Sequence, residues 1–488
     1  MKILKQLCCN YREVGILAVY YRKTHLMNHI RLILLSLSLV PSAGLVAWQP
    51  VSKLPSTPPR PNILFIMADD LGYGDLSCFG ATDLHTPYID SLIGGGMKFT
   101  TFYANSPVCS PSRAALLSGR YPEQVGVPGV IRDDSTDSWG YLAPALLLPN
   151  YLFKAGYQTG LVGKWHLGTE SPNLPNQRGF EEFNGFLGDM MDDYVTKRRG
   201  NLNHLRHNRQ VIDPPGHATD VFTNGAIRYL NERARQRAVK TGRPFFLYLA
   251  YNAPHNPLQP PATYLDRIMK NNPTINPTRA KLVALIEHLD ASVGRVLAAL
   301  RANGQDKNTI VVFTSDNGGW GPGKATVGPY RGFKGTMYEG GLRIPAGIRW
   351  PVGIRPHTTA TRPLLLMDWM PTLLELAGAP IPNGLNGRSF AGLLIGKDTT
   401  AGSARPLFYV RREGNDGYKG LQIHALRNGD FKLLQASPFT PYELYNLKTD
   451  PAETTNLAEQ NSVIRDQMTR QLMDHIRKGG AVPWQKSK

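Results

Sequence analysis

Residues 62–68 read Asn-Ile-Leu-Phe-Ile-Met-Ala and run directly into Asp69 and Asp70. A continuous apolar run of this length is typical of a strand buried on both faces of a parallel sheet. Two adjacent carboxylates at the end of such a strand are costly to bury unless a cation meets them. Open α/β sheets carry their sites just beyond the carboxyl ends of strands, so this stretch predicts both a fold class and a metal site.

The same layout recurs downstream, where buried strands alternate with helices. The predicted strands and the polar clusters after them are 158–162 with Gly-Lys-Trp-His-Leu-Gly, 244–250 with Asn-Ala-Pro-His, and 309–315 with Asp-Asn-Gly-Gly. Helices are predicted at 143–155 and at 281–301, and the second has its apolar residues on one face at i, i+3, i+4, i+7 spacing. This alternation predicts an α/β fold with a doubly wound, mostly parallel sheet flanked by helices.

From residue 376 the pattern changes to short segments. The predicted elements of this region are antiparallel strands at 406–410, 423–427, 431–435 and 442–446 and a final helix at 462–478. We therefore expect a main domain of residues 61–375, followed by a smaller C-terminal α+β subdomain of residues 376–488 that contains a short antiparallel sheet.

The N-terminal 60 residues have a different character. Residues 1–47 are interpreted as an extension and a signal peptide, in which a charged start at 27–31 precedes a short apolar run at 32–40. Translation could begin at Met27, and cleavage could follow Ala43 or Ala47. The apolar run is too short for a stable membrane span, so we expect export to the periplasm or secretion. A linker rich in Pro, Ser and Thr occupies 48–60.

The composition bounds the function. The 488 residues carry 55 Lys and Arg against 37 Asp and Glu, a net charge of +18. The basic residues are scattered, without the clustered basic helix or aromatic-rich basic sheet that indicates nucleic-acid binding. A cationic surface suits polyanionic substrates such as sulfated glycans, although an ordinary solvated surface is the alternative.

The segment from Cys109 to Arg113 reads Cys-Ser-Pro-Ser-Arg and continues to Gly119-Arg120. We expect it to open a helix, with Ser110 as the N-cap and Pro111 at the first helical position. Free backbone amides and the positive helix end would then favour an anion beside Cys109. Arg113 adds a forked donor suited to sulfate or phosphate. Cys78 could pair with Cys109 in an oxidising compartment unless Cys109 is modified.

This motif resembles the signature of the type I, arylsulfatase-like sulfatases, which have an alkaline-phosphatase-like fold. The resemblance covers residues 61–350 well. It implies that a formylglycine-generating maturation enzyme oxidises Cys109 to formylglycine (3-oxoalanine). It also implies a bound calcium ion, and the expected metal ligands are Asp69, Asp70, Cys109, Asp316 and Asn317. The hard oxygen ligands among these select calcium or magnesium over zinc, and calcium is the ion of the family.

The resemblance implies the catalytic residues as well: Cys109, Arg113, Lys164, His166, His255 and Lys334. In the implied mechanism, a hydroxyl of hydrated formylglycine attacks sulfur, His255 and Lys334 protonate the departing alcohol, and His166 takes a proton as sulfate is released. Arg113, Lys164 and the metal would hold the sulfate oxygens. Lys164 and His166, two apart on an extended segment, are expected to point to the same side.

The sequence therefore predicts a sulfuric ester hydrolase that acts on a sulfated saccharide. Candidate substrate-binding residues, which could hydrogen-bond sugar hydroxyls, are Asp189, Asp192, Asp193, Tyr194, His217 and Arg331. A solvated acidic loop is the alternative for the first three. Two other functions stay open: a phosphate or phosphonate monoester hydrolase of the same superfamily, and a non-catalytic binder of sulfated glycans with an unmodified Cys109.

Overall fold

The stretch 62–68 forms the central strand β1 (Asn62–Ala68), and all of its residues are buried. β1 pairs in parallel with β11 (Thr309–Ser315) on one side and with β10 (Phe245–Ala250) on the other. The computed structural model describes residues 60–132, 142–239, 242–398, 405–413 and 418–479. The predicted signal peptide and almost all of the predicted linker lie outside the described residues.

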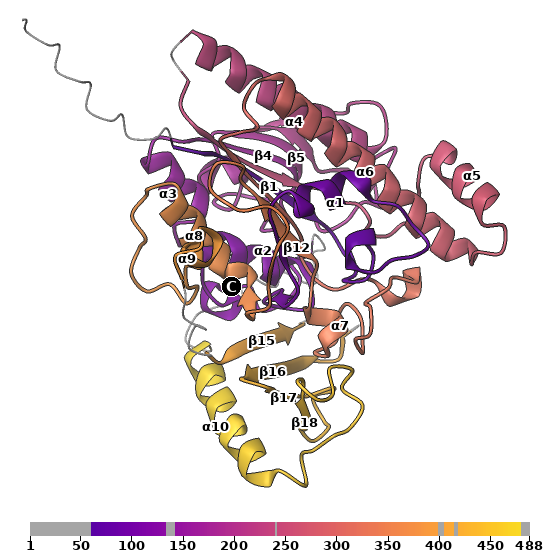
Figure 1. Cartoon of the computed structure of the whole chain (residues 1–488), viewed down its shortest axis with the longest axis vertical. Helices are drawn as coiled ribbons and strands as arrows, with labels where there is room; N and C mark the ends of the chain where they lie inside the picture. Colours follow the sequence, from indigo (N-terminus) through magenta and orange to yellow (C-terminus); the bar gives the residue numbers. More distant parts are fainter. Residues whose placement is uncertain (1–59, 133–141, 240–241, 399–404, 414–417, 480–488) are drawn as a thin grey trace, which may run out of the picture. The chain divides into compact units, whose positions relative to one another are not determined.

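The described strands make one large mixed sheet and three smaller ones (Figure 1). The large sheet has the order β13 (Thr358–Ala360), β2 (Met97–Phe99), β12 (Ala346–Arg349), β11, β1, β10, β4 (Gln158–Lys164), β5 (Glu182–Phe186), β8 (Leu205–His207) and β9 (Gln210–Val211). Strands β11, β1, β10, β4 and β5 run parallel, and the antiparallel pairs lie toward the two edges. The fold class predicted from the sequence is confirmed.

Helices cover both faces of this sheet (Figure 1). The helix bounds are α1 (Pro87–Gly94), α2 (Cys109–Ser118), α3 (Leu148–Lys154), α4 (Ala218–Ala238), α5 (Ala262–Asn271), α6 (Pro277–Ala302), α7 (Glu339–Leu342), α8 (Trp369–Leu376), α9 (Ala391–Leu394) and α10 (Ser462–Gly479). Of these, α2, α3 and α8 lie on one face of the sheet, and α1, α4 and α6 lie on the other. Short 3₁₀ turns occur at Ser77–Phe79, Pro122–Val125, Pro175–Gln177, Gly321–Gly323 and Leu366–Asp368. Within the described ranges, no helix combines the length and apolar character needed to cross a bilayer.

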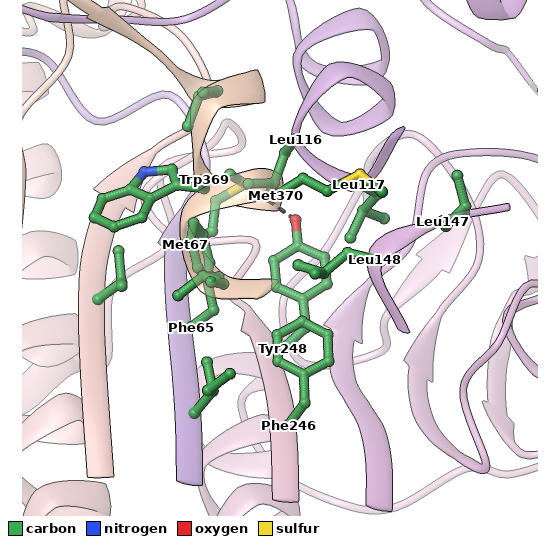
Figure 2. Packing of buried hydrophobic residues seen from close by; sticks show 14 of the residues in the cluster. Phe65, Met67, Leu116, Leu117, Leu147, Leu148, Phe246, Tyr248, Trp369 and Met370 are labelled. Carbon is green, nitrogen blue, oxygen red and sulfur yellow. Dashed lines mark hydrogen bonds between the residues drawn. The ribbon is translucent and has the colours of Figure 1, made fainter. Parts of the chain in front are cut away.

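Alternation along β1 divides the core into two layers. Ile63, Phe65 and Met67 point into a cluster with residues of α2, α3 and α8, whereas the intervening residues belong to a cluster with α1, α4 and α6. Figure 2 shows the first cluster, where Tyr248 of β10 and Trp369 of α8 pack near Phe65. Burial on both faces explains why the strand is apolar at every position except its first.

The helix predicted at 143–155 is shorter than expected. Residues 143–147 are not helical, and α3 begins only at Leu148. Pro144 and Pro149 lack the amide hydrogen that a helix interior needs, and Pro149 is tolerated because it falls in the first turn. The side chain of Asn150 accepts a hydrogen bond from the amide of Leu147, which fixes this starting point.

The C-terminal region contains the predicted four-stranded antiparallel sheet. Its strands, in spatial order, are β15 (Leu407–Arg412), β16 (Gln422–Asn428), β17 (Phe431–Leu434) and β18 (Glu443–Asn446). α10 packs on this sheet through Met468 and Leu472. The remaining two-stranded sheets pair β3 (Phe102–Tyr103) with β14 (Leu364–Leu365) and β6 (Arg198–Arg199) with β7 (Leu202–Asn203). The domain boundary at residue 375 stays a prediction.

Candidate active site

Polar side chains from four parallel strands meet at one edge of the large sheet. Asp69 and Asp70 follow β1, Lys164 ends β4, His255 lies beyond β10, and Asp316 follows β11. These four strands are consecutive neighbours in the sheet and run in the same direction. Their carboxyl ends therefore bring together residues that are far apart in the sequence.

Cys109 lies at the start of α2, as the sequence predicts, but the cap differs from the prediction. Val108, in an extended conformation, is the N-cap, and Ser110 and Pro111 lie within the first turn. The Ser110 hydroxyl accepts a hydrogen bond from the amide of Ile131 instead of capping the helix. No side chain caps α2, so its terminal amides are not occupied by a cap beside Cys109. Cys109 and Cys78 are both free cysteines.

Three cations neutralise three carboxylates around this cysteine. Arg113 donates from Nε and Nη2 to Oδ2 of Asp316, at 3.0 and 2.7 Å. Lys164 Nζ lies 2.6 Å from Oδ2 of Asp69. Lys334 Nζ lies 2.7 Å from Oδ2 of Asp70.

Burial and ion pairing act in opposite directions on these carboxylates. Burial alone would raise the pKa of Asp69, but Lys164, His255 and Arg113 outweigh it and lower that pKa. For Asp70, burial is likewise outweighed, chiefly by Lys334, and the pKa is lowered. Both carboxylates are therefore held ionised in a region without water contact.

The residues fit a hard metal ion. Oδ1 of Asp69 and Oδ1 of Asn317 are buried oxygens without a hydrogen-bond partner among the described residues. Asn317 donates its Nδ2 to Asp70, at 2.8 Å, which identifies its oxygen as the atom left over for a cation. Ligand atoms of Asp69, Asp70, Cys109 and His255 lie within 4.8 Å of one another. Unpartnered carboxylate and amide oxygens are what calcium or magnesium requires.

His166 is held with one ring nitrogen available. Its Nε2 lies 2.8 Å from the carbonyl oxygen of Ile131, and because a carbonyl only accepts, Nε2 carries the proton. Nδ1 is buried and has no partner in the described structure. Burial, together with Lys164 and Arg113, lowers the pKa of His166 well below its usual value, so the ring is neutral. The backbone here is left-handed, with φ 58°, which corrects the expectation of an extended segment.

His255 and Lys334 form the more accessible side of the cluster. Their side chains are 9% and 17% exposed, whereas those of Arg113, Lys164 and Asp69 are fully buried. Nδ1 of His255 donates to the carbonyl of Asn256, so Nε2 accepts from Lys334 Nζ at 3.1 Å. Burial first, and then Lys334, lower the pKa of His255, while Asp70 raises the pKa of Lys334. The proton of this pair therefore rests on the lysine.

Comparison with known proteins identifies this arrangement. Residues 61–379 match the family model described as Sulfatase, and residues 330–478 match the one described as N-sulphoglucosamine sulphohydrolase, C-terminal. The chain belongs to the sulfatase family. As a member of that family it is a hydrolase of sulfate esters, and the predicted enzyme class is confirmed.

Two curated relatives and one solved structure illustrate how far this sulfatase resembles known ones. It is 33% identical to human arylsulfatase A over 478 residues, which cover 86% of each chain. It is 33% identical to N-acetylgalactosamine-6-sulfatase of Sus scrofa over 398 residues, covering 77% of this chain and 72% of the relative. The crystal structure of Ps i-CgsB in complex with k-i-k-neocarrahexaose matches with a TM-score of 0.77 at 31% identity, covering 86% of this chain and 93% of that one.

The unmodified thiol of this sulfatase is a poor nucleophile. Cys109 is buried, and burial raises the pKa of its thiol to about 12 despite the nearby Lys164 and Lys334. At neutral pH the sulfur is therefore protonated, and only a thiolate attacks readily.

The three acidic candidates for substrate binding form ion pairs or hydrogen bonds with nearby residues of the same segment. Asp189 and Asp192 both pair with Arg199, at 3.2 and 2.7 Å. Asp193 accepts hydrogen bonds from the amides of Val195 and Thr196.

Two other candidates, His217 and Arg331, also have partners. His217 caps α4 and lies 3.0 Å from the carbonyl of Gln259. Arg331 donates to the hydroxyl of Tyr445 and the carbonyl of Glu453 in the C-terminal region.

Sequence reasoning missed several groups that hold the catalytic candidates. The carbonyl of Ile131 orients His166, and a backbone atom leaves no residue signal. Tyr194 is predicted only as a saccharide contact, but its hydroxyl lies 2.8 Å from the carbonyl oxygens of both Asn252 and His255. Arg411 of β15 donates to the carbonyl of Gly335, next to Lys334, at 2.7 Å. No local sequence pattern connects Arg411 with that loop, because the contact joins two distant parts of the chain.

Proposed function

We propose that this sulfatase removes sulfate from a sulfated carbohydrate, using formylglycine formed at position 109 and a bound calcium ion. The observation that carries the proposal is the cluster of cations and neutral imidazoles around Cys109, in which the side chains of His255 and Lys334 are more exposed than those of Arg113 and Lys164. The named relative N-acetylgalactosamine-6-sulfatase and the oligosaccharide in the Ps i-CgsB complex support a saccharide.

The proposed reaction needs two groups that the unmodified chain does not itself provide: formylglycine, formed from Cys109, and a bound metal ion. Hydrated formylglycine would supply an attacking hydroxyl and, in its second hydroxyl, the means of releasing sulfate. Calcium would supply positive charge beside it, held by Asp69, Asp70, Asp316 and Asn317. The buried Oδ1 atoms of Asp69 and Asn317, which accept no hydrogen bond within the described residues, suit such an ion. Magnesium is the alternative ion.

Arg113 and Lys164 would bind the sulfate oxygens. Both cations are fully buried beside Cys109, and both are anchored by carboxylates, Asp316 and Asp69 respectively. Fixed charges in a water-free site stabilise developing negative charge without having to reorganise.

Lys334 and His255 would deliver the proton to the departing alcohol. The hydrogen bond between them keeps a proton at the exposed mouth of the cluster, where the saccharide must leave. His166 is neutral and buried, and its Nδ1 has no hydrogen-bond partner within the described residues, so it would act as the base during sulfate release. The two proton transfers thus use two differently prepared imidazoles.

The saccharide contacts and the cellular location belong to the same proposal. Asp192, with a side chain 44% exposed, is the member of the acidic loop best able to meet a sugar hydroxyl. Asp189, Asp193, His217 and Arg331 would act from around it. We further propose export of the mature chain, after conversion by a formylglycine-generating enzyme.

The decisive experiment weighs the tryptic peptide 99–113 of protein expressed with a formylglycine-generating enzyme. Conversion of Cys109 lowers the mass by about 18 Da. The converted protein should hydrolyse aryl sulfate and sulfated saccharides, and the Cys109→Ala protein should not. The proposal would be contradicted if Cys109 stayed unmodified while the same enzyme converted the cysteine of a control sulfatase. A preference of the converted enzyme for aryl phosphate would instead favour the phosphate-hydrolase alternative.

A further inference from the structure

Three side chains outside the candidate active site meet where α4 begins. His217 precedes α4, Asp220 lies in its first turn, and His288 belongs to α6. Each can offer one ligand atom, and these atoms lie within 4.8 Å of one another. Nε2 of His288 is 3.2 Å from Oδ2 of Asp220, a separation suited to two ligands of one tetrahedral ion with bonds of about 2.0–2.2 Å.

The imidazole of His217 is oriented for such a role. Its Nε2 lies 3.0 Å from the carbonyl oxygen of Gln259, so Nε2 carries the proton and Nδ1 keeps its lone pair. In the structure, Nδ1 uses this lone pair to accept a long hydrogen bond, 3.3 Å from the amide of Thr219, which a metal ion would replace. Metal-binding histidines usually donate their other ring nitrogen to a carbonyl or carboxylate in this manner.

Asp220 and His288 complete the set. Oδ1 of Asp220 accepts from Arg295 at 2.8 Å, which orients the carboxylate and leaves Oδ2 toward His288. His288 is only 4% exposed, and its Nδ1 has no hydrogen-bond partner in the part of the chain that the structure describes. The nitrogen of His288 on the Asp220 side is Nε2, and it is therefore the ligand atom that this residue would offer.

We propose that His217, Asp220 and His288 bind a zinc ion, with water in the fourth position. Two imidazoles and a carboxylate are a ligand set of open zinc sites, whereas calcium takes oxygen ligands alone. The site shares no residue with the candidate calcium site, so it does not depend on the proposed sulfatase mechanism.

The ion would also brace a segment next to the active site. The ring of His217 stacks on Tyr194, with centroids 4.9 Å apart, and the Tyr194 hydroxyl lies 2.8 Å from the carbonyl of His255. Zinc at this position would therefore tie α4 and α6 to the loop that carries His255.

The test measures zinc bound by the full-length protein that has first been saturated with calcium. Wild type is compared with His217→Gln, Asp220→Asn and His288→Gln, and with His85→Gln, an exposed histidine outside the cluster, as the matched control. Wild type and the control should bind one zinc equivalent more than the three variants. Cobalt(II) should give the visible absorption of a tetrahedral site only in the same two proteins, and zinc should raise only their melting temperatures.

Two further controls distinguish zinc binding at the proposed site from misfolding of a variant and from zinc binding at the candidate calcium site. His288→Gln alters a buried residue, so the partly exposed His217 and Asp220 variants decide the outcome if it fails to fold. An Asp316→Asn protein, changed in the candidate calcium site, should keep the extra zinc equivalent. Equal zinc binding by wild type and the His217 and Asp220 variants would overturn the proposal. Loss of the equivalent in Asp316→Asn alone would also overturn it, since zinc would then occupy the active site.

Discussion

At the scale of single residues, hydrogen bonds decide which nitrogen of each active-site histidine can react. His166 donates from Nε2 to a carbonyl and keeps a free Nδ1, whereas His255 donates from Nδ1 and presents Nε2 to Lys334. In the proposed mechanism, these two histidines, which look equivalent in the sequence, serve opposite proton transfers. This division of labour leads to the first prediction.

Replacing His166 by Asn should slow sulfate release more than alcohol release. The variant lacks the base on the buried side, and a general base typically contributes about 10²–10⁴-fold. Rapid mixing with an aryl sulfate should therefore give a burst of about one equivalent of phenol, followed by slow turnover. The His255→Asn variant should instead lose the burst, because the fast step itself is impaired. Identical kinetic profiles for the two variants would contradict the assigned roles.

At the scale of secondary-structure elements, Gly335 links the Lys334 loop to the C-terminal sheet. Its φ is 90°, and a Cβ added here would lie 2.6 Å from Nη1 of Arg411. The Arg411 side chain donates to the Gly335 carbonyl and, through Nε, to Glu413. The position of Lys334 therefore depends on an element about 75 residues further along the chain.

We predict that Gly335→Ala lowers kcat roughly 10–100-fold, because it displaces the Lys334 ammonium. The matched control is Gly304→Ala at the end of α6, where φ is 65° and no atom lies within 4 Å of the added Cβ. Both variants place an alanine at a positive φ, which costs about 1–2 kcal/mol or more. Steady-state kinetics should separate them, and an equal loss of kcat would refute the positional argument.

β16 carries a buried histidine that should make stability pH-dependent. Burial, aided by His475 and Arg412, lowers the pKa of His424 from 6.5 to about 4. In the unfolded chain, His424 binds a proton below pH 6.5, whereas in the folded chain it does so only below about pH 4. Stability is therefore fully present above pH 6.5 and falls by up to about 3 kcal/mol as the pH drops to 4. Melting temperatures should fall less over this window in His424→Gln, but as steeply as in wild type in the exposed-site control His85→Gln.

The start of α6 and the apolar spacing in α4 show which local sequence signals predict a helix. α6 begins at Pro277, four residues before the predicted start, because Asn276 accepts hydrogen bonds from the amides of Thr278 and Arg279. The Asn-Pro pair is a readable start signal. α4 was not predicted, although its apolar residues recur with helical spacing among many charged ones.

At the scale of the whole molecule, a network of buried ion pairs joins the C-terminal sheet to α7. Lys432 of β17 lies between Glu339 of α7 and Glu453, at 3.0 and 2.9 Å, and all three side chains are 0–1% exposed. Glu339 in turn pairs with Arg343 at 3.1 Å. α7 follows the Lys334 loop directly, so this network supports the same loop as Arg411.

Lys432→Met should destabilise the protein by about 3–5 kcal/mol, because two buried carboxylates lose their shared cation. Arg235→Met, which removes an exposed pair with Glu232, should change stability by no more than about 0.5 kcal/mol. Denaturant melts of the two variants provide the comparison. Equal midpoints would show that the buried network contributes no more than a surface pair.

Removal of the proposed calcium ion should loosen the molecule at the centre of its large sheet, because the candidate ligands follow both β1 and β11. Calcium at about 100 times its dissociation constant should add about 2.7 kcal/mol to the free energy of unfolding. Chelation should therefore lower both the melting temperature and the activity of wild type. Asp316→Asn should lose this response. Asp75→Asn should keep it, because Asp75 is an equally buried carboxylate that pairs with Arg279 instead.

The sequence by itself determined which apolar runs become buried strands, which carboxylates and cations follow them, and which cysteine opens a helix. These properties depend on local burial and periodicity, which neighbouring residues encode. Only the tertiary structure decided which atoms remain free, since Ile131 selects the tautomer of His166 and Lys334 reaches Asp70 across 264 residues. It also decided that His217 caps α4 and packs beside His288. Such contacts join distant segments through packing, and no local pattern carries that information.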